Sequence, residues 1–534
     1  MIMNLDGVWD FAFTKSVDDN PCYNSAMAVP GCFDAAGLYY PQRGCGWYKK
    51  NVKIAETGTY RLRIASSGMR TAIFCDGKLL KDSYLAWSPS EVEFPAEKGF
   101  VEIVIRTDNF SEGHPLFRDF YDFYPFGGIF DHVTMEKVEA DEIRSIQVFP
   151  LSHTTGEVEI HVETTAETLQ IAFDGVDYKT MPAQKVFRCN VPNFKVWSTE
   201  TPNLHTVTIN GKDATFGIRT LDWSGPDLLL NGEKIKLLGV NRHDSHPEFG
   251  SATPEALIAN DLLMLKEAGF NFIRGSHYPQ REFLFDTCDR LGLLVWEEPL
   301  AWGNSHKPTW GNGTVPDDFE ENSVFVETLA EQLKVTIRNS INHPSLIIHG
   351  FLNECESQHE AVRDTIKRYM DICHSMDPTR PATFACNRMT NDISIDLCDI
   401  QAINIYPAWY SDEGVECIVP TIDKYLKEKI SDKKPFMISE IGAAAIYGDH
   451  SGIRWSEEYQ SELCCTVLEK VLTDPRCNGL ALWHFANANT YINCVRAISR
   501  PRGFNNKGLL DEYRRPKLAW RDLSKRVKEY NKNK

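Results

Sequence analysis

The chain has 534 residues, 42% of them hydrophobic and 25% charged, which is the composition of an ordinary globular protein. Its formal net charge of -17 argues against nucleic acid and anionic membranes as partners, because like charges repel. The length is too great for one ordinary core and indicates about three domains, or two if one is a large barrel. No run approaches the roughly 20 apolar residues of a membrane span, and the N-terminal sequence has no secretory pattern.

The 15 cysteines are scattered through apolar segments such as FLFDTCDRLG and SELCCTVLEK. They show neither the paired CxxC spacing of zinc sites nor the density of a small disulfide-stapled domain. Free cysteine commonly behaves as a small buried hydrophobic residue. We therefore expect reduced core thiols and a cytoplasmic protein.

Residues 1–138 consist of short runs of alternating hydrophobicity, such as TYRLRIA, TAIFCDGKLL and FVEIVIRTDN, separated by turn residues. A period of two is typical of antiparallel strands, so this region predicts an all-β domain. Residues 139–224 supply further short strands in EIRSIQVFPL, GEVEIHVETTA, LQIAFDG and LHTVTIN. About 80 residues with this density of strands suit an immunoglobulin-like sandwich.

Residues 225–534 alternate strand-like and helix-like segments, which predicts parallel strands joined by helical crossovers. The candidate strands are KIKLLGV, NFIRGS, LLVWEE, SLIIHGFLN, ATFACN, DIQAINIY, PFMISEI and GLALWHF. Eight such units in about 300 residues fit a closed (β/α)8 barrel.

Polar side chains follow most of these predicted strands, at the end of the barrel where such folds place their active sites. They include Asn241, His243, Arg274, His277, Glu297, Glu298, Asn353, Glu354, Asn404, Tyr406, Glu440, Trp483 and His484. A single strand-end carboxylate or imidazole is often only structural, and Glu297 and Glu298 have that interpretation. Together, however, carboxylates, imidazoles, amides and aromatic rings suit sugar hydroxyls and an oxocarbenium-like transition state.

Glu354, in LIIHGFLNE, and Glu440, in PFMISEIG, each close a short apolar segment. Two carboxylates at the mouth of a barrel can divide the acid and nucleophile roles of glycoside hydrolysis. We therefore interpret the chain as an enzyme with Glu354 and Glu440 as its catalytic pair.

Other chemistries fit the sequence less well. His243 and His246 are three residues apart, but a loop HxxH pair without further ligands is a weak metal signal, so we expect no metal and no other cofactor. The sequence has no GxxxxGK[ST] loop for a nucleotide. The pair Gly127 and Gly128 lies in the β region, where a dinucleotide site is not expected.

Five segments resemble glycoside hydrolase family 2, which includes β-galactosidases and β-glucuronidases. They are GVNRHDSHPEFG, LLMLKEAGFNFIRGSHYP, LGLLVWEE, NHPSLIIHGFLNE and PFMISEIGA. VWSTETPNLHTVTI is similar to the signature of the family's second domain. The resemblance runs through the whole chain. It implies a jelly-roll β-sandwich over residues 1–138, an immunoglobulin-like sandwich over 139–224 and a catalytic (β/α)8 barrel over 225–534.

In the family's pattern, Glu354 matches the general acid/base and Glu440 matches the nucleophile. The resemblance thus implies hydrolysis with retention of anomeric configuration, through a covalent glycosyl-enzyme intermediate. Asn353, directly before the acid/base, is expected to hold the 2-hydroxyl of the sugar. Four strand-end residues are also expected to line the sugar site: His243, His277, Asn404 and Trp483.

The C-terminal run RPRGFNNKGLLDEYRRPK resembles the NxK element of β-glucuronidases, here Asn505 and Lys507. An ammonium group and an amide suit a C6 carboxylate, because charge-assisted hydrogen bonds are strong. The resemblance therefore implies a β-linked uronic acid, as a small molecule or an oligosaccharide, as the substrate.

Further residues match the sugar contacts of β-glucuronidases. Tyr406 and Tyr410, in NIYPAWY, match tyrosines that flank the sugar. Asp122, in DFYPFGGI, matches an aspartate that reaches its hydroxyls. Arg502, or Arg500, is expected to add positive charge at the carboxylate.

The substrate has alternatives. The run HDSHP is closer to β-galactosidases than to typical β-glucuronidases, so a β-galacturonidase, or a β-galactosidase of neutral sugars, is an alternative. An inactive carbohydrate-binding protein with the same fold is the non-enzyme alternative. The resemblance also implies a homo-oligomer. Residues 299–325 are expected to form a loop over the mouth, in which Trp302 and Trp310 could contact an aglycone.

Overall fold

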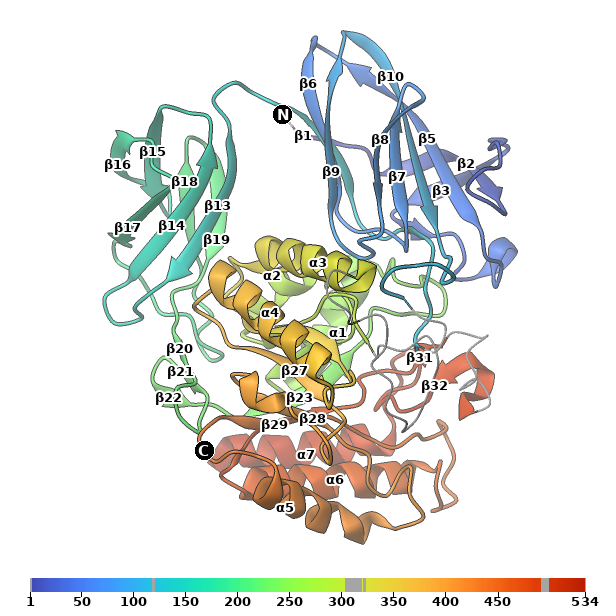
Figure 1. Ribbon diagram of the computed structural model, residues 1–534, viewed down its shortest axis with the longest axis vertical. Coiled ribbons are helices and arrows are strands. Elements are labelled where there is room, and N and C mark those ends of the chain that lie inside the picture. The colour runs from blue at the N-terminus through green and yellow to red at the C-terminus, as the bar shows by residue number, and fades with distance from the viewer. Residues whose placement is uncertain (1, 118–120, 303–318, 320–322, 491–498, 534) are drawn as a thin grey trace.

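The computed structural model describes residues 2–117, 121–302, 319, 323–490 and 499–533. Its N-terminal part is a sandwich of two antiparallel sheets, with strand orders β1-β12-β6-β9 and β3-β2-β5-β10-β7-β8 (Figure 1). We call it the first sandwich. Its strands are β1 (Ile2–Asn4), β2 (Gly7–Thr14), β3 (Ser25–Val29), β5 (Cys45–Ile54), β6 (Gly58–Ile64), β7 (Thr71–Cys75), β8 (Lys78–Ser83), β9 (Ser90–Ala96), β10 (Gly99–Asp108) and β12 (Val133–Lys137), with the short pair β4 (Gly31–Cys32) and β11 (Gly128–Ile129) beside them.

The alternation of side chains decides which face of each sheet is buried. In β6, Tyr60, Leu62 and Ile64 are buried, whereas Arg61 and Arg63 between them are partly exposed. Successive side chains of a strand point to opposite faces, so the apolar set faces the opposite sheet. The inward residues of both sheets form one hydrophobic core.

A second sandwich follows, with the sheets β13-β14-β17 and β16-β15-β18-β19. Its strands are β13 (Ile143–Pro150), β14 (Glu157–Thr164), β15 (Thr168–Phe173), β16 (Val176–Pro182), β17 (Val186–Asn190), β18 (His205–Ile209) and β19 (Lys212–Phe216). A small antiparallel sheet leads from it to the barrel and consists of β20 (Leu221–Asp222), β21 (Leu229–Leu230) and β22 (Glu233–Lys234).

Eight parallel strands then close into a barrel in chain order. They are β23 (Leu237–Arg242), β24 (Phe272–Gly275), β25 (Leu294–Glu297), β26 (Leu346–Asn353), β27 (Ala382–Cys386), β28 (Gln401–Asn404), β29 (Phe436–Ile441) and β30 (Cys477–Leu482). The helices of this region are α1 (Glu255–Glu267), α2 (Glu282–Leu291), α3 (Val324–Ser340), α4 (Glu360–Met376), α5 (Ile418–Glu428), α6 (Glu457–Thr473) and α7 (Leu518–Asn533). Every residue of these strands is buried, as in strands covered on both faces.

The predicted architecture of two sandwiches and a (β/α)8 barrel is confirmed, and each of the eight candidate segments overlaps a barrel strand. Figure 1 shows the two sandwiches apart from each other at the top, above α2 and α3, with α5, α6 and α7 at the bottom. The boundaries at residues 138 and 224 stay predictions.

The first sandwich shares a core with the barrel. The ring of Trp87 stacks on that of Tyr278, with centroids 4.3 Å apart, and its Nε1 donates to Ser251 Oγ at 3.2 Å. Phe123 lies 5.4 Å from the ring of His243 at the end of β23. These contacts join segments far apart in the sequence, so the first sandwich helps to build the mouth of the barrel.

The cysteines that the structure describes are all free, and most of them are buried in the cores. Among the described residues, no helix combines the length and the apolar character needed to cross a bilayer.

Candidate active site

The carboxyl ends of the barrel strands bring the predicted polar residues to one mouth. Asn241 on β23 is in register with Arg274 on β24, and Asn404 on β28 is in register with Glu440 on β29. All four side chains are buried. Since the strands are parallel and closed into a ring, residues at their ends face a common space.

Two donors hold Glu440. Arg274 Nη1 donates to its Oε1 at 2.7 Å, and the hydroxyl of Tyr406 donates to its Oε2 at 2.8 Å. His277 Nε2 lies 3.6 Å from Oε1. This arrangement fixes both carboxylate oxygens and stabilises their negative charge.

The surroundings of Glu440 act on its charge in two directions. Burial raises the pKa of Glu440 to about 8, and the charge of Glu354 adds to the rise. Arg274 and Tyr406 act in the opposite direction. Burial thus favours the neutral form of Glu440, and its two hydrogen-bond donors favour the ionised form.

Glu354 has different surroundings. It follows β26 with a backbone φ of 50°, in the left-handed region that non-glycine residues seldom occupy. Trp302 Nε1 donates to its Oε2 at 3.0 Å, and Asn404 Nδ2 donates to its Oε1 at 3.2 Å. These two partners are neutral, whereas Glu440 has a guanidinium beside it. Different environments are what give two carboxyl groups different roles.

Arg274 connects the groups of the mouth, although the sequence analysis placed it at a strand end without giving it a role. Its guanidinium donates to Asn241 Oδ1 at 2.9 Å, to Asn353 Oδ1 at 2.8 Å and to Glu298 Oε1 at 2.7 Å. Glu298 also lies 3.0 Å from His277 Nδ1. A signal was available, because buried carboxylates at one mouth require a buried cation.

Imidazole and indole rings line one side of the mouth. His277 is nearly parallel to Trp302 and to Trp483, with ring centroids 5.7 and 5.1 Å apart. His243 meets Trp483 edge-on at 5.3 Å. Burial lowers the pKa of both imidazoles well below the usual value, so they are neutral. Both ring nitrogens of His243 and Nδ2 of Asn353 are buried without a hydrogen-bond partner among the described residues, so they can serve a ligand.

Lys507 lies on another side of the mouth and is buried. Its Nζ donates to the hydroxyl of Tyr410 at 2.8 Å. The ammonium lies 5.6 Å from the ring centre of Tyr406, 5.7 Å from that of Trp409 and 5.0 Å from that of Tyr410. Burial, together with the charge of Arg500, lowers the pKa of Lys507. A desolvated ammonium among aromatic rings is a strong partner for an anion.

Asp122 reaches the mouth from the first sandwich. Arg500 Nε donates to its Oδ1 at 2.9 Å and to its Oδ2 at 3.0 Å. The hydroxyl of Thr490 donates to Oδ1 at 2.7 Å, and Asn505 Nδ2 donates to Oδ2 at 3.0 Å. Asp122 therefore orients Asn505, and Arg500 compensates its charge.

The two candidate arginines have different surroundings in the structure. Arg500 is buried against Asp122. The side chain of Arg502 is 55% exposed and pairs with Glu512, with Nη1 2.8 Å from Oε1. The structure thus brings Arg500, rather than Arg502, to the predicted sugar site.

Comparison with known proteins places this geometry in a family. The model described as "Glycosyl hydrolases family 2, TIM barrel domain" matches residues 224–531, more than half of the chain. The chain belongs to glycoside hydrolase family 2. It is accordingly a glycoside hydrolase.

Solved and curated relatives cover nearly the whole family 2 chain. A β-galacturonidase from Eisenbergiella tayi bound to galacturonate is 29% identical, with 99% of this chain and 97% of that chain covered and a TM-score of 0.89. A β-galacturonidase from the same organism bound to glycerol is 30% identical, with 99% and 96% covered and the same TM-score of 0.89. A β-glucuronidase from Streptococcus agalactiae serotype V is 26% identical, with 98% of this chain and 95% of that protein covered.

The segment 299–325 of this family 2 chain enters the mouth at its start. Asn353 N donates to Ala301 O at 3.1 Å, and Trp302 contacts Glu354 and His277 as described above. Trp310 lies outside the described residues. Trp302 is therefore a neighbour of the carboxylate pair, whatever else it contacts.

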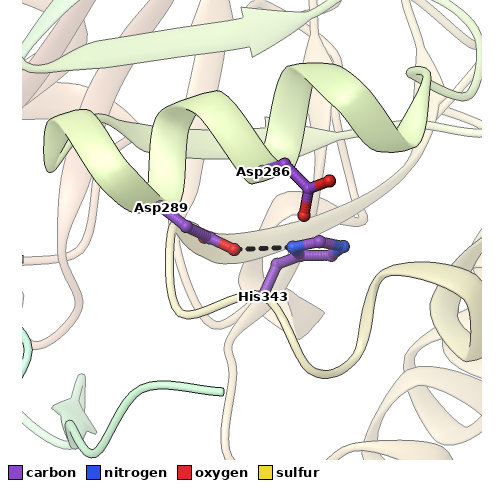
Figure 2. A group of neighbouring side chains, drawn as sticks. All are labelled: Asp286, Asp289 and His343. Carbon is purple, nitrogen blue, oxygen red and sulfur yellow. Dashed lines mark hydrogen bonds and ion pairs between the residues drawn. The ribbon is translucent and has the colours of Figure 1, made fainter. Parts of the chain in front are cut away.

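Among the residues that the structure describes, Asp286, Asp289 and His343 form a group in the family 2 barrel that could hold a metal ion (Figure 2). Asp286 and Asp289 lie on α2, and Asp289 Oδ2 is 2.6 Å from His343 Nδ1. Asp289 Oδ1 accepts the N–H of Ser345 at 2.9 Å. Burial alone would lower the pKa of His343, but the neighbouring carboxylates have the larger effect, so the pKa is raised. A protonated imidazole does not bind a metal. We interpret the cluster as an ion pair that anchors the turn before β26. The expected absence of a metal stays a prediction.

Proposed function

We propose that this chain is a retaining exo-β-glycosidase that hydrolyses β-D-hexuronides, with Glu440 as nucleophile and Glu354 as general acid/base. The observation that carries the proposal is the position of Tyr406. Its hydroxyl donates a hydrogen bond to Glu440 Oε2 at 2.8 Å, and the centre of its ring lies 5.6 Å from the ammonium of Lys507. One sugar can therefore offer its anomeric carbon to Glu440 and its C6 carboxylate to Lys507. Relatives that are named β-galacturonidase and β-glucuronidase support the proposal.

The surroundings of the two carboxylates support a double displacement. In the first step Glu440 attacks the anomeric carbon while Glu354 gives its proton to the departing glycosidic oxygen. Arg274 and Tyr406 align Glu440 for this attack and stabilise its ionised form relative to the neutral one. In the second step Glu354 takes a proton from water, the water oxygen bonds the anomeric carbon, and the bond to Glu440 breaks. The uronic acid leaves with its original configuration, and Glu440 regains its charge.

Some buried polar atoms at the mouth have no hydrogen-bond partner in the part of the chain that the structure describes, which supports contacts to the sugar hydroxyls. Asn353 Oδ1 is occupied by Arg274 and Asn404, so the side chain is oriented and its Nδ2 remains for the 2-hydroxyl. The ring nitrogens of His243 suit a further hydroxyl. Trp483, packed against both imidazoles, offers an apolar face to the sugar ring.

Asn505 and Lys507 form what we call the carboxylate clamp. Burial removes water from the Lys507 ammonium, and only an anion replaces that hydration well. Arg500 balances the charge of Asp122, so Lys507 leaves the local charge positive. A neutral hexose would leave this charge without a counter-ion, which favours uronides over galactosides.

Among hexuronides, the solved relatives at 29% and 30% identity favour β-galacturonides, although the clamp suits β-glucuronides equally. We further propose that the enzyme acts in the cytoplasm as a homo-oligomer. The free, buried cysteines suit a reducing compartment. Light scattering on the purified enzyme would test the oligomeric state.

The test is kcat/KM on p-nitrophenyl β-D-glucuronide, β-D-galacturonide and β-D-galactoside. We expect a uronide preference of at least about 100-fold, or about 2.7 kcal/mol of transition-state binding. Lys507→Met should remove the preference, whereas Lys424→Met, at an exposed lysine of α5, should not. Preference for the galactoside would overturn the clamp, and normal hydrolysis by Glu440→Gln would overturn the nucleophile.

A further inference from the structure

Lys517 is a buried lysine directly behind the carboxylate clamp, just before α7. Its Nζ donates to three oxygen atoms: Gly508 O at 2.7 Å, Asn506 O at 3.0 Å and Asn487 Oδ1 at 3.0 Å. Two of these acceptors are the backbone carbonyls on either side of Lys507. Lys517 thus fixes the backbone from which the proposed substrate-binding ammonium extends.

The rest of this segment is also bound through its backbone. The carbonyl of Lys507 accepts from His484 N at 3.2 Å and from Gln460 Nε2 at 3.3 Å. Gln460 Nε2 also donates to Gly508 O at 3.1 Å. Among these donors Lys517 is the charged one, and hydrogen bonds from a charged donor are the stronger ones.

The number of acceptors requires a protonated lysine. An ammonium has three N–H donors, whereas a neutral amine has two, so deprotonation leaves one of the three oxygens without its partner. Burial lowers the pKa of Lys517 to about 7, against the opposing charges of nearby carboxylates. The titratable or charged groups that interact with it are Glu457, Asp511, Glu512, Arg502, His484 and Cys464.

We propose that Lys517 is a positioning residue that holds Lys507 and Asn505 in the geometry that binds a uronide carboxylate, and that this geometry is lost when Lys517 gives up its proton. The inference rests on the proposed function, since it assigns the clamp to a uronide. Lys517 acts through the backbone of residues 506–508 and not on the reacting atoms. Its loss therefore raises KM for uronides and leaves the chemistry at Glu354 and Glu440 in place.

The test compares the wild-type enzyme with Lys517→Met, Lys517→Arg and a control, Lys525→Met, at an exposed lysine of α7. KM and kcat are measured for the p-nitrophenyl uronides and galactoside between about pH 6 and pH 9. In the wild type, KM for uronides should rise as the pH increases above about 7, whereas KM for the galactoside should not. Lys517→Met should raise that KM about tenfold or more at the low end and remove its pH dependence.

The arginine variant separates charge from shape. It keeps its proton throughout this range, so its KM for uronides should stay flat where that of the wild type rises. If Lys517→Met does not fold, as judged by circular dichroism and thermal unfolding, the wild-type pH series and Lys517→Arg still decide.

Two outcomes would overturn the inference. If folded Lys517→Met had an unchanged KM for uronides and the wild type still preferred uronides, Lys517 would not be a positioning residue. If Lys517→Met lost kcat and galactoside turnover as strongly as it lost uronide binding, Lys517 would have a structural role only. A wild-type enzyme without a uronide preference would instead overturn the proposed function itself, and the inference with it.

Discussion

Tyr406 touches both the proposed nucleophile and the carboxylate clamp, so its hydroxyl can be tested alone. In Tyr406→Phe, Glu440 loses the donor at 2.8 Å. Removing a donor to the ionised form raises the pKa of a carboxyl group, and Glu440 must be ionised to attack. We expect the acidic limb of the pH profile of kcat/KM to move to higher pH, and kcat/KM at neutral pH to fall about tenfold or more.

The matched control is Tyr178→Phe, at a partly exposed tyrosine of the second sandwich, whose profile should equal that of the wild type. An unshifted acidic limb in Tyr406→Phe would mean that this hydrogen bond does not stabilise the ionised Glu440.

Glu354 is expected to matter most when the leaving group needs a proton. Glu354→Gln should lower kcat on a poor leaving group by about 100- to 10,000-fold, the usual range for general acid catalysis. On a 2,4-dinitrophenyl uronide, which leaves without protonation, the first step should stay fast and the second should be slow. A burst of phenol and a protein mass increased by one uronyl group should follow. Equal losses on both leaving groups would contradict the acid/base assignment.

For single residues, the sequence indicates a role where that role follows from a place at the end of a predicted strand. Glu354, Glu440 and Asn404 were found because they end predicted strands of one barrel. Arg274 ends a strand too, but its importance depends on which buried anions it meets, and that requires coordinates. Arg500 could not be chosen over a second arginine two residues away, because spacing does not reveal which side chain faces inward.

Among the elements, two strands of two residues each lie next to the carboxylate clamp. β31 (Ala488–Asn489) and β32 (Phe504–Asn505) pair antiparallel and lead into Gly508. A Cβ at Gly508 would lie 2.2 Å from Asn487 N and 2.4 Å from Leu510 O, both of them backbone atoms. Gly508→Ala should therefore displace the clamp and raise KM for uronides about tenfold or more.

Gly225→Ala is the matched control, because a Cβ there meets no atom within 4 Å. Kinetics on a uronide and on a neutral galactoside would check the expectation. A wild-type KM in Gly508→Ala would show that the segment tolerates a shift without loss of binding.

The barrel strands were predictable, and the two-residue strands at the mouth were not. The barrel strands are buried on both faces, so they appear as apolar runs between helical patterns. The two-residue strands β31 and β32 are too short to show a period, so the resemblance alone pointed to their neighbourhood. Lys517 ends the run RPRGFNNKGLLDEYRRPK, but only the fold places it behind Lys507.

For the whole molecule, the mouth depends on two parts of the chain that are far apart in sequence. Asp122 is separated by 368 residues from Thr490 and by 383 residues from Asn505, which it contacts. No local pattern can reveal contacts of this range, and Asp122 was found only through the resemblance. The first sandwich thus contributes to the mouth of the barrel in this structure.

An isolated barrel, residues 225–534, tests this dependence. Without the first sandwich, Tyr278 loses the ring of Trp87, His243 loses Phe123, and Arg500 and Asn505 lose Asp122. The fragment would expose apolar surface and leave a buried guanidinium without its counter-ion, which is strongly destabilising. We expect it to bind a hydrophobic dye, to unfold at a lower temperature than the intact chain and to leave p-nitrophenyl uronides intact. A folded fragment with full uronide turnover would show that Asp122 is not needed at the site, and the assignment of Asp122 and of its partner Arg500 would fall.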